Sequence, residues 1–355
     1  MKKKHIFRLS AFLLIVACIL VILCDLFEYP NSHMSERFKT YESFEKNTVD
    51  AVYIGTSGTD RFWLSAKAFE DYGMTVYPLS IEALPSWNTL NVVKYAFKYQ
   101  NPKLVIIDTR SFLWNPTENV NTDAKRSRRV ADQFSLFSYN RIDAINRSLK
   151  MMNEIDPTVK KFDLSYYLPF IRYHNMWSDE DFTFGEIGRS GTKYLGYRFV
   201  SNKSIRIRAI DEPVFSDKTA ELDKYNTFYL HELIDYFKEN KIDALFVSSP
   251  RQIDESNVYL NNAIYKIIRE EGMNCINFSE KENVEKYQFD YSHDFFDEGH
   301  TNFYGAVKYT DYFAKYLSDN YDLPDHREDE KCAEWHGVYE YICSQIEKLE
   351  AKKAK

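Results

Sequence analysis

The sequence predicts an α/β fold, a doubly wound parallel sheet, preceded by one membrane-spanning helix. The first observation is a long apolar run near the N-terminus of the 355-residue chain. The second is a repeated alternation of short β-rich runs with segments of helical spacing, which indicates parallel strands joined by crossover helices. The third is that polar residues follow several of these runs directly, where active sites form in such sheets.

The apolar run, Leu9–Cys24, follows a basic start made of Met1–Lys4 and Arg8. With its flanks it reaches about 20 residues, the length of one bilayer crossing. The basic end should stay in the cytoplasm. A cleaved signal peptide is the alternative, but the exit after Cys24 lacks an A-x-A-like site. We therefore expect a signal anchor over 1–28 in a single-pass protein of the cell membrane, with the C-terminal domain extracytoplasmic.

After a polar linker over 29–48, one α/β domain is expected over 49–322. Its expected strands are Val49–Ile54, Met74–Leu79, Leu104–Asp108, Ala244–Ser248 and Asn274–Phe278. Its expected helices are 61–72, Ser86–Tyr99, 217–239, 255–271 and Phe303–Ser318. Residues 114–212 break this alternation and predict a mainly helical insertion, a cap or a substrate-binding lobe. Residues 323–355 predict a charged helical tail.

Composition narrows the classes of function. The net charge is −7 and no long basic stretch lies outside the first residues, so no nucleic-acid surface is expected. The five cysteines are widely spaced and form no C-x-x-C pair, which argues against a disulfide framework and a metal site. We expect neither a metal nor a cofactor. The 27 Tyr and 26 Phe either stack on sugars or fill the core.

Ser57 is the candidate nucleophile. It follows the first expected strand, between Gly55 and Gly58, where a tight turn exposes a serine beside backbone N–H groups. The carboxyl ends of the other strands should bring Ser80, Asp108–Arg110 and Ser248–Arg251 to the same edge. The alternative is that Ser57 only caps the following helix.

A second segment offers a base for this serine. Asp297 precedes His300 by three residues, just before the last expected helix of the domain. This spacing allows the carboxylate to orient the imidazole while the imidazole takes a proton from Ser57. His293 and Asp294 form a rival pair, and a histidine beside a carboxylate is often only structural.

Together these segments resemble the SGNH (GDSL-like) hydrolase superfamily. Gly55-Thr56-Ser57 is similar to its first block, and Asp297-Glu298-Gly299-His300 is similar to its last block, D-x-x-H. The layout is most similar to the membrane-anchored, extracytoplasmic branch, which includes the DltD type of teichoic acid synthesis and the alginate-type O-acetylation proteins. Shared features include the N-terminal anchor, the stretch Asn101–Asp108 and the stretch His300–Gly305. The resemblance covers roughly 48–320, except the insertion.

The resemblance implies a flavodoxin-like sheet and a catalytic triad. Ser57 would be the nucleophile, His300 the general base and acid, and Asp297 the residue that orients His300. The superfamily's second and third blocks supply a Gly N–H and an Asn amide to the oxyanion hole. Here the second block would fall near Ser80, and the third after Asp108, without these residues.

The oxyanion hole would therefore rest on the backbone N–H groups of Ser57 and Gly58, with Ser80 as a further candidate. Arg110 either binds an acidic or phosphate group of the substrate or forms an ion pair with a neighbouring carboxylate. Trp87 and Trp114, like Trp63, either stack on sugar rings or pack in the core.

These features predict serine-dependent O-acyl transfer outside the cytoplasm, with an acetyl or D-alanyl group passed to a cell-surface polysaccharide or teichoic acid. The resemblance implies a polytopic membrane acyltransferase of the MBOAT type as partner. One alternative is a polysaccharide acetylesterase, which would turn over esters rapidly in water. Another is a non-catalytic glycan-binding or scaffold protein of an acylation complex, which the two missing oxyanion residues favour.

Overall fold

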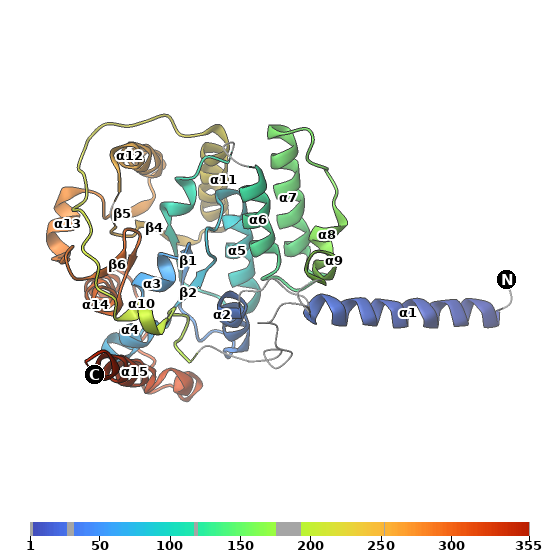
Figure 1. The fold of residues 1–355 in the computed structure, drawn as a ribbon, viewed down its shortest axis with the longest axis horizontal. Coiled ribbons are helices and arrows are strands. Elements are labelled where there is room, and N and C mark those ends of the chain that lie inside the picture. Colours follow the sequence, from blue (N-terminus) through green and yellow to red (C-terminus); the bar gives the residue numbers. More distant parts are fainter. Residues whose placement is uncertain (1–2, 27–31, 117–119, 175–192, 252, 355) are drawn as a thin grey trace.

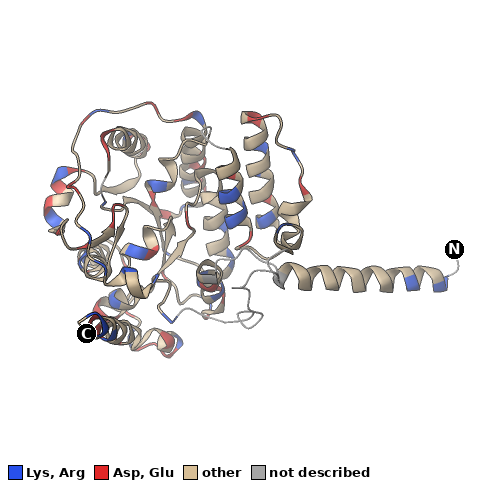
Figure 2. Cartoon of the chain, in the orientation of Figure 1, with Lys and Arg blue, Asp and Glu red and all other residues tan. Residues whose placement is uncertain are grey.

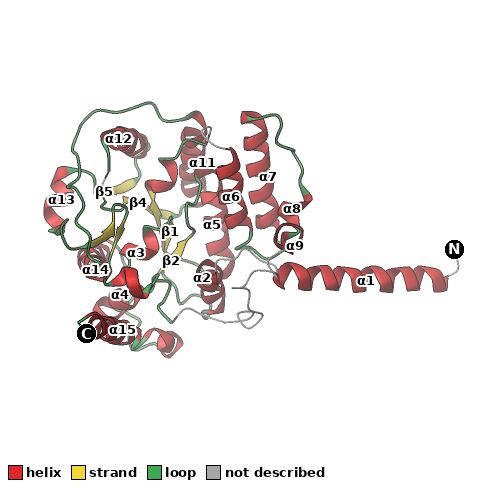
Figure 3. Ribbon diagram, in the orientation of Figure 1, coloured by secondary structure: helices red, strands yellow, loops and turns green. Residues whose placement is uncertain are grey.

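The computed structural model describes residues 3–26, 32–116, 120–174, 193–251 and 253–354. Over these ranges the chain forms a parallel five-stranded sheet with helices on both sides, and one helix that projects away from the domain (Figure 1). Figure 3 separates the central strands from the surrounding helices. The expected α/β class with a parallel sheet is confirmed.

The sheet has the strand order β2-β1-β3-β4-β5. The strands are β1 Ala51–Gly55, β2 Val76–Ser80, β3 Leu104–Asp108, β4 Asp243–Ser248 and β5 Asn274–Asn277. In the register, Gly55 lies opposite Ser80, and Asp108 opposite Val247, so the carboxyl ends of four strands share one edge. Every residue of β1, β2 and β3 is buried, which explains why these strands read as apolar runs.

Alternate strand residues enter two cores, one on each face of the sheet. Val52 and Ile54 face a core that includes α5 Ser86–Tyr99, α11 Lys224–Asn240 and α12 Glu255–Glu270. Ala51 and Tyr53 face a second core, built on α4 Ser65–Tyr72 and α14 Phe303–Asn320. Because side chains alternate along a strand, each strand contributes to both cores.

The remaining elements connect or extend this framework. They are α3 Thr59–Phe62, η1 Thr109–Phe112, α6 Val120–Ala131, α7 Tyr139–Ile155, α8 Leu164–Tyr167, α9 Pro169–Tyr173, α10 Ser201–Ser204 and α13 Lys281–Tyr287. A two-stranded hairpin, β6 Phe295–Asp297 and β7 His300–Thr301, precedes α14. The helices α6 and α7 pack on α5 around a third core that includes Trp87 and Leu149.

The N-terminal helix α1, Lys3–Leu26, is apolar and largely separate from the domain. Its segment Lys3–Cys24 is long and apolar enough to cross a membrane. At a rise of about 1.5 Å per residue this segment is about 33 Å long. Figure 2 shows its Lys and Arg residues only toward the N-terminal end. The boundary expected between residues 28 and 29 lies outside the described residues.

The segment expected to be a polar linker contains a helix that belongs to the core. This helix, α2, spans Ser32–Ser43 and buries Met34, Phe38 and Tyr41 completely or almost completely. These residues recur at positions i, i+4 and i+7, the spacing of one helix face. Charged residues between them gave the segment its polar appearance.

The C-terminal tail also packs on the domain. Its helices are η4 Glu330–Trp335 and α15 Val338–Lys353. The buried Trp335 ring lies 5.4 Å from Phe44 and 5.6 Å from Phe69, centroid to centroid. Such aromatic contacts bury a large apolar area, so the tail contributes to the stability of the domain.

Candidate active site

Ser57 lies on the turn that joins β1 to α3, at the carboxyl edge of the sheet. Its Oγ is 2.8 Å from Nε2 of His300, which comes from β7, 243 residues later. The turn depends on Gly55, because a Cβ there would lie 2.5 Å from Cβ of Asp108 and 2.2 Å from Oγ1 of Thr59. The close approach of β1 to β3 therefore brings the serine to the edge.

His300 and Asp297 face each other across the β6–β7 hairpin. Nδ1 of His300 lies 2.8 Å from Oδ1 of Asp297, which also accepts a hydrogen bond of 2.9 Å from Gly299 N. The imidazole stacks on Phe296 with ring centroids 5.5 Å apart. With the proton on Nδ1, Nε2 is left to accept the hydroxyl proton of Ser57. The hairpin thus explains the D-x-x-H spacing.

The environment keeps His300 in its basic form. Burial lowers the pKa of His300; the hydrogen bond with Asp297 raises it, and the nearby charge of Arg110 lowers it. Burial by itself would raise the pKa of Asp297, but its hydrogen bond with His300 lowers it below the usual value. At neutral pH the pair is therefore a neutral imidazole held by a carboxylate, as a general base requires.

We expect ester turnover by the full chain to rise with pH through the pKa of His300, because only the neutral imidazole accepts the serine proton. The midpoint of the acidic limb of kcat/KM should lie below the usual histidine value of about 6.5. Measuring kcat/KM for a chromogenic acetyl ester across pH tests this. Arg110→Gln removes a charge that disfavours imidazolium and should raise the midpoint. An acidic limb above the usual value, or one unaffected by Arg110→Gln, would contradict this assignment.

Arg110 lies between the two loops that carry Ser57 and His300. Its Nη1 donates a hydrogen bond of 3.1 Å to the carbonyl of Gly299. A Cβ at Gly299 would lie 2.8 Å from its Nη2, and a Cβ at Gly58 would lie 3.5 Å from its Nη1. Burial lowers the pKa of Arg110, and the nearby charges of Asp108 and Asp297 raise it. Among the described residues, no carboxylate lies within ion-pair distance of its guanidinium.

Arg251 also lies at this edge of the sheet. The sequence placed it there only because it follows the strand that ends at Ser248. With Arg110 and Trp114 it lines a pocket of about 680 Å³. Burial, together with the charge of Arg110, lowers the pKa of Arg251 to about 9. Burial also raises the pKa of Asp108, although this carboxyl accepts a hydrogen bond from Arg110 N. Two positive side chains therefore line this pocket, together with the acidic residues Glu221 and Asp223.

The oxyanion candidates lie at the same edge. Gly58 N is 3.4 Å from Oγ1 of Thr56, a long contact that leaves this N–H weakly engaged. Ser80 is buried opposite Gly55, and its hydroxyl has no hydrogen-bond partner among the described residues. Both groups therefore remain candidates for an oxyanion hole at this turn.

Of the three tryptophans predicted to stack on sugars or pack in the core, one lines the pocket and two are buried. Trp114 lines the pocket, with its ring 4.8 Å from the Arg126 guanidinium carbon. Trp87 is only 1% exposed and donates its indole N–H to Ser127. The expectation that Trp87 stacks on a sugar is therefore wrong, because no face of its ring is open. Trp63 is likewise buried.

The rival pair, His293 and Asp294, forms no hydrogen bond with Ser57 among the described residues. Nδ1 of His293 is 3.2 Å from Oδ1 of Asp294, and Lys308 contributes an ion pair of 2.7 Å to the same buried carboxylate. Asp294 also accepts the backbone N–H of Asp290. These bonds fix the chain that enters the β6–β7 hairpin, which is a structural role.

One group of described residues has the composition of a metal site, and it lies away from Ser57. It consists of His326, Asp329 and Cys332 in the C-terminal tail. The two ring nitrogens of His326 already contact Asp50 at 2.5 Å and Asp329 at 3.3 Å. These contacts tie the tail to Asp50, which directly precedes β1.

No family model matches this chain, and no curated protein matches it either. The assignment of function therefore depends on the chemistry of the site and on the sequence resemblance.

Proposed function

We propose that this chain is an extracytoplasmic O-acyltransferase that uses Ser57, His300 and Asp297 as a catalytic triad. The observation that carries the proposal is the continuous chain of two hydrogen bonds, each 2.8 Å, from Ser57 Oγ through the imidazole to Asp297. Serine nucleophiles need both a base within reach and a group that orients the base. A serine that only caps a helix needs neither.

The fold supports membership of the SGNH type. The strand order 2-1-3-4-5 is that of flavodoxin-like sheets, in which ligands bind at the carboxyl ends of the strands. Ser57 follows β1, which lies between β2 and β3, and the D-x-x-H hairpin directly precedes the last helix of the domain, α14. Both positions agree with the first and last blocks of that superfamily.

In the proposed reaction, Ser57 Oγ attacks the carbonyl carbon of an acyl donor while Nε2 of His300 takes the hydroxyl proton. The backbone N–H groups at Ser57 and Gly58 stabilise the negative charge on the carbonyl oxygen. His300 then returns the proton to the leaving group, which leaves an acyl ester on Ser57. In the second half, His300 takes the proton of an acceptor hydroxyl, whose oxygen attacks the acyl carbon. The bond from that carbon to Ser57 Oγ then breaks, and His300 returns the proton to Oγ.

Arg110, Arg251 and Trp114 suit the recognition of an acidic acceptor. A guanidinium binds carboxylate or phosphate oxygens through two parallel hydrogen bonds, and an indole covers a sugar ring. The acceptor would therefore be a cell-surface polysaccharide or teichoic acid. In this proposal α1 anchors the chain, the domain lies outside the cytoplasm, and a polytopic acyltransferase of the MBOAT type supplies the acyl group.

Two other functions use the same geometry. A polysaccharide acetylesterase would pass the acyl group to water, and rapid hydrolysis of an acetyl ester without an acceptor would favour it. A non-catalytic scaffold is favoured by the missing Gly and Asn of the oxyanion hole. A Ser57 that never reacts, in a protein that still binds glycan, would support the scaffold.

The proposal is tested by the acyl content of the cell surface in a strain that carries Ser57→Ala in place of the native gene. We expect the acyl esters on the surface polymer to fall to the level of a deletion strain, with the variant protein present at normal amounts. Ser292→Ala, an exposed serine outside the site, is the matched control. Unchanged acylation in the Ser57→Ala strain would remove the transferase proposal.

A further inference from the structure

Large exposed apolar side chains gather on one part of the helical insertion. They are Phe137 and Tyr139 before and at the start of α7, Ile142 within it, and Phe162 and Leu164 before and at the start of α8. Phe137, Tyr139 and Phe162 are 72%, 78% and 62% exposed. Soluble surfaces seldom leave several large apolar residues so open in one region, and such regions commonly mark a contact with a membrane or a protein.

We call the surface that carries these residues the insertion face. Phe162 stacks on Tyr167 with centroids 5.0 Å apart. The Tyr167 hydroxyl donates a 2.6 Å hydrogen bond to Asn146, one turn after Ile142 on α7. The segment that carries Phe162 and Leu164 therefore lies against the exposed side of α7.

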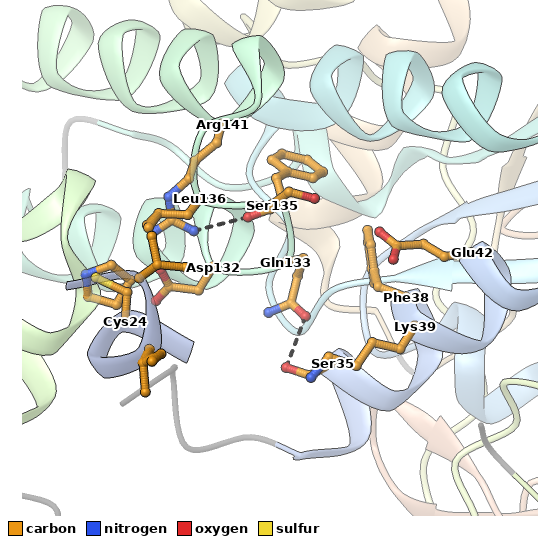
Figure 4. A pocket seen from close by; sticks show the side chains of 14 residues that line it. Cys24, Ser35, Phe38, Lys39, Glu42, Asp132, Gln133, Ser135, Leu136 and Arg141 are labelled. Carbon is orange, nitrogen blue, oxygen red and sulfur yellow. Dashed lines mark hydrogen bonds and ion pairs between the residues drawn. The ribbon is translucent and has the colours of Figure 1, made fainter. Parts of the chain in front are cut away.

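The same part of the insertion touches the end of α1. Cys24 is 2% exposed, and with Val21 and Ile22 it lines a cavity of about 360 Å³. The opposite wall includes Leu136, which precedes Phe137, and Pro169, the first residue of α9. Figure 1 shows α8 and α9 beside the C-terminal end of α1, and Figure 4 shows Cys24 facing Leu136 and Asp132.

A buried arginine holds this surface in one arrangement. Arg141 forms an ion pair of 2.6 Å with Asp132 and donates hydrogen bonds to the carbonyls of Phe134 and Tyr166, each 3.2 Å long. It thereby joins the end of α6, the start of α7 and α8. The exposed apolar residues project from a fixed scaffold rather than from an independent loop.

The length of α1 determines where the insertion face lies relative to the bilayer. The hydrocarbon core of a bilayer is about 30 Å thick, and the segment Lys3–Cys24 is about 33 Å long. Its basic end must reach one surface, so Cys24 has to lie at the opposite boundary of the hydrocarbon. Residues packed beside Cys24 then lie at the level of the lipid headgroups.

The charges around the insertion face suit that level. Lys160 and Lys161 are exposed directly before Phe162, and Arg172 is exposed on α9. One acidic residue, Asp163, lies between Phe162 and Leu164, and its carboxylate is 3.6 Å from the Arg128 guanidinium. Aromatic rings inserted at the headgroup boundary, flanked by long basic side chains that reach lipid phosphates, are typical of interfacial membrane contacts.

We propose that the insertion face is a second membrane contact, inserted into the headgroup layer of the bilayer that α1 crosses. This inference rests on the membrane anchoring that forms part of the proposed function. It does not depend on catalysis. A domain attached at two points keeps one orientation, whereas a domain on a single helix rotates freely about it, so the face fixes the direction in which the site opens.

The test is tryptophan quenching in the full chain reconstituted into vesicles of phosphatidylcholine and phosphatidylglycerol that contain brominated lipid. Phe162→Trp reports on the insertion face. Phe228→Trp is the matched control, because Phe228 is 60% exposed and lies on α11, which is separated from α1 by α5–α7 (Figure 1). Leu14→Trp reports on the middle of α1. The quenching of the five native tryptophans is measured in the unaltered protein and subtracted.

We expect the added tryptophan at 162 to be quenched at least about twofold more than the one at 228, since contact quenching requires lipid around the indole. Leu14→Trp should be strongly quenched. Equal quenching at 162 and 228, with Leu14→Trp quenched, would overturn the insertion face alone. Protection of residue 162 that appears only with a second membrane protein would also overturn it, in favour of a protein contact. An unquenched Leu14→Trp would overturn the anchor and the face together, without bearing on the triad.

Discussion

Ser57→Ala and His300→Ala should each lower acyl transfer by about 10³-fold or more, and the double variant should lose no more than either single one. The two residues act as a unit, because the imidazole has no proton to accept without the hydroxyl and the hydroxyl has no base without the imidazole. The measurement is the initial rate of acyl transfer by the purified full chain at a pH above the pKa of His300.

The control for this pair is His293→Ala. His293 is also beside an aspartate, but its contacts fix the entrance to the hairpin and do not include Ser57. We expect its transfer rate to stay within a few-fold of the unaltered protein. A loss at His293 as large as at His300, or additive losses in the Ser57 and His300 double variant, would contradict the assigned base.

Arg37→Met should cost about 3–5 kcal/mol of unfolding free energy, because it leaves the buried Asp60 without its charge partner. Arg37 lies on α2 and forms an ion pair with Asp60, on α3 beside Ser57. It also donates hydrogen bonds to the carbonyls of Gly196 and Ser80, at 3.0 Å and 2.9 Å. One side chain thus joins α2, the insertion and the sheet edge.

The measurement is denaturant unfolding of the full chain in detergent. Lys46→Met, an exposed lysine just after α2, is the matched control and should change the stability by less than about 0.5 kcal/mol. Equal stability of the two variants would show that α2 is only a connector and that its burial contributes little.

Much of the sheet was predictable because buried parallel strands have a simple pattern. Leu104–Asp108 is apolar until its last residue, since both faces of β3 are covered. The helix α2 was missed for a related reason. Its buried Met34, Phe38 and Tyr41 are spaced by charged residues, and Arg37, itself charged, is buried through pairing with Asp60. Average polarity hides such a helix, although its apolar spacing was visible.

In the candidate site, too, some residues could be predicted from the sequence and others could not. Ser57, Asp297 and His300 were identifiable because a strand end and a D-x-x-H spacing restrict where their side chains lie. The side-chain environments of Trp87 and Arg251 were not, because they depend on how the insertion packs. Trp87 is covered by α6 and α7, whereas Arg251 faces a pocket that also includes Trp114. Sequence spacing within one element contains no information about such contacts.

The most direct test of the central claim is the reaction of the full chain with a fluorophosphonate, followed by intact mass and peptide mapping. A serine activated by His300 should take up one phosphonyl group, located on Ser57 and absent from Ser57→Ala. His300→Ala should label at least about 10²-fold more slowly, because general-base assistance contributes rate enhancements of that order. A folded protein whose Ser57 stays unlabelled, or whose labelling is unaffected by His300→Ala, would contradict the triad.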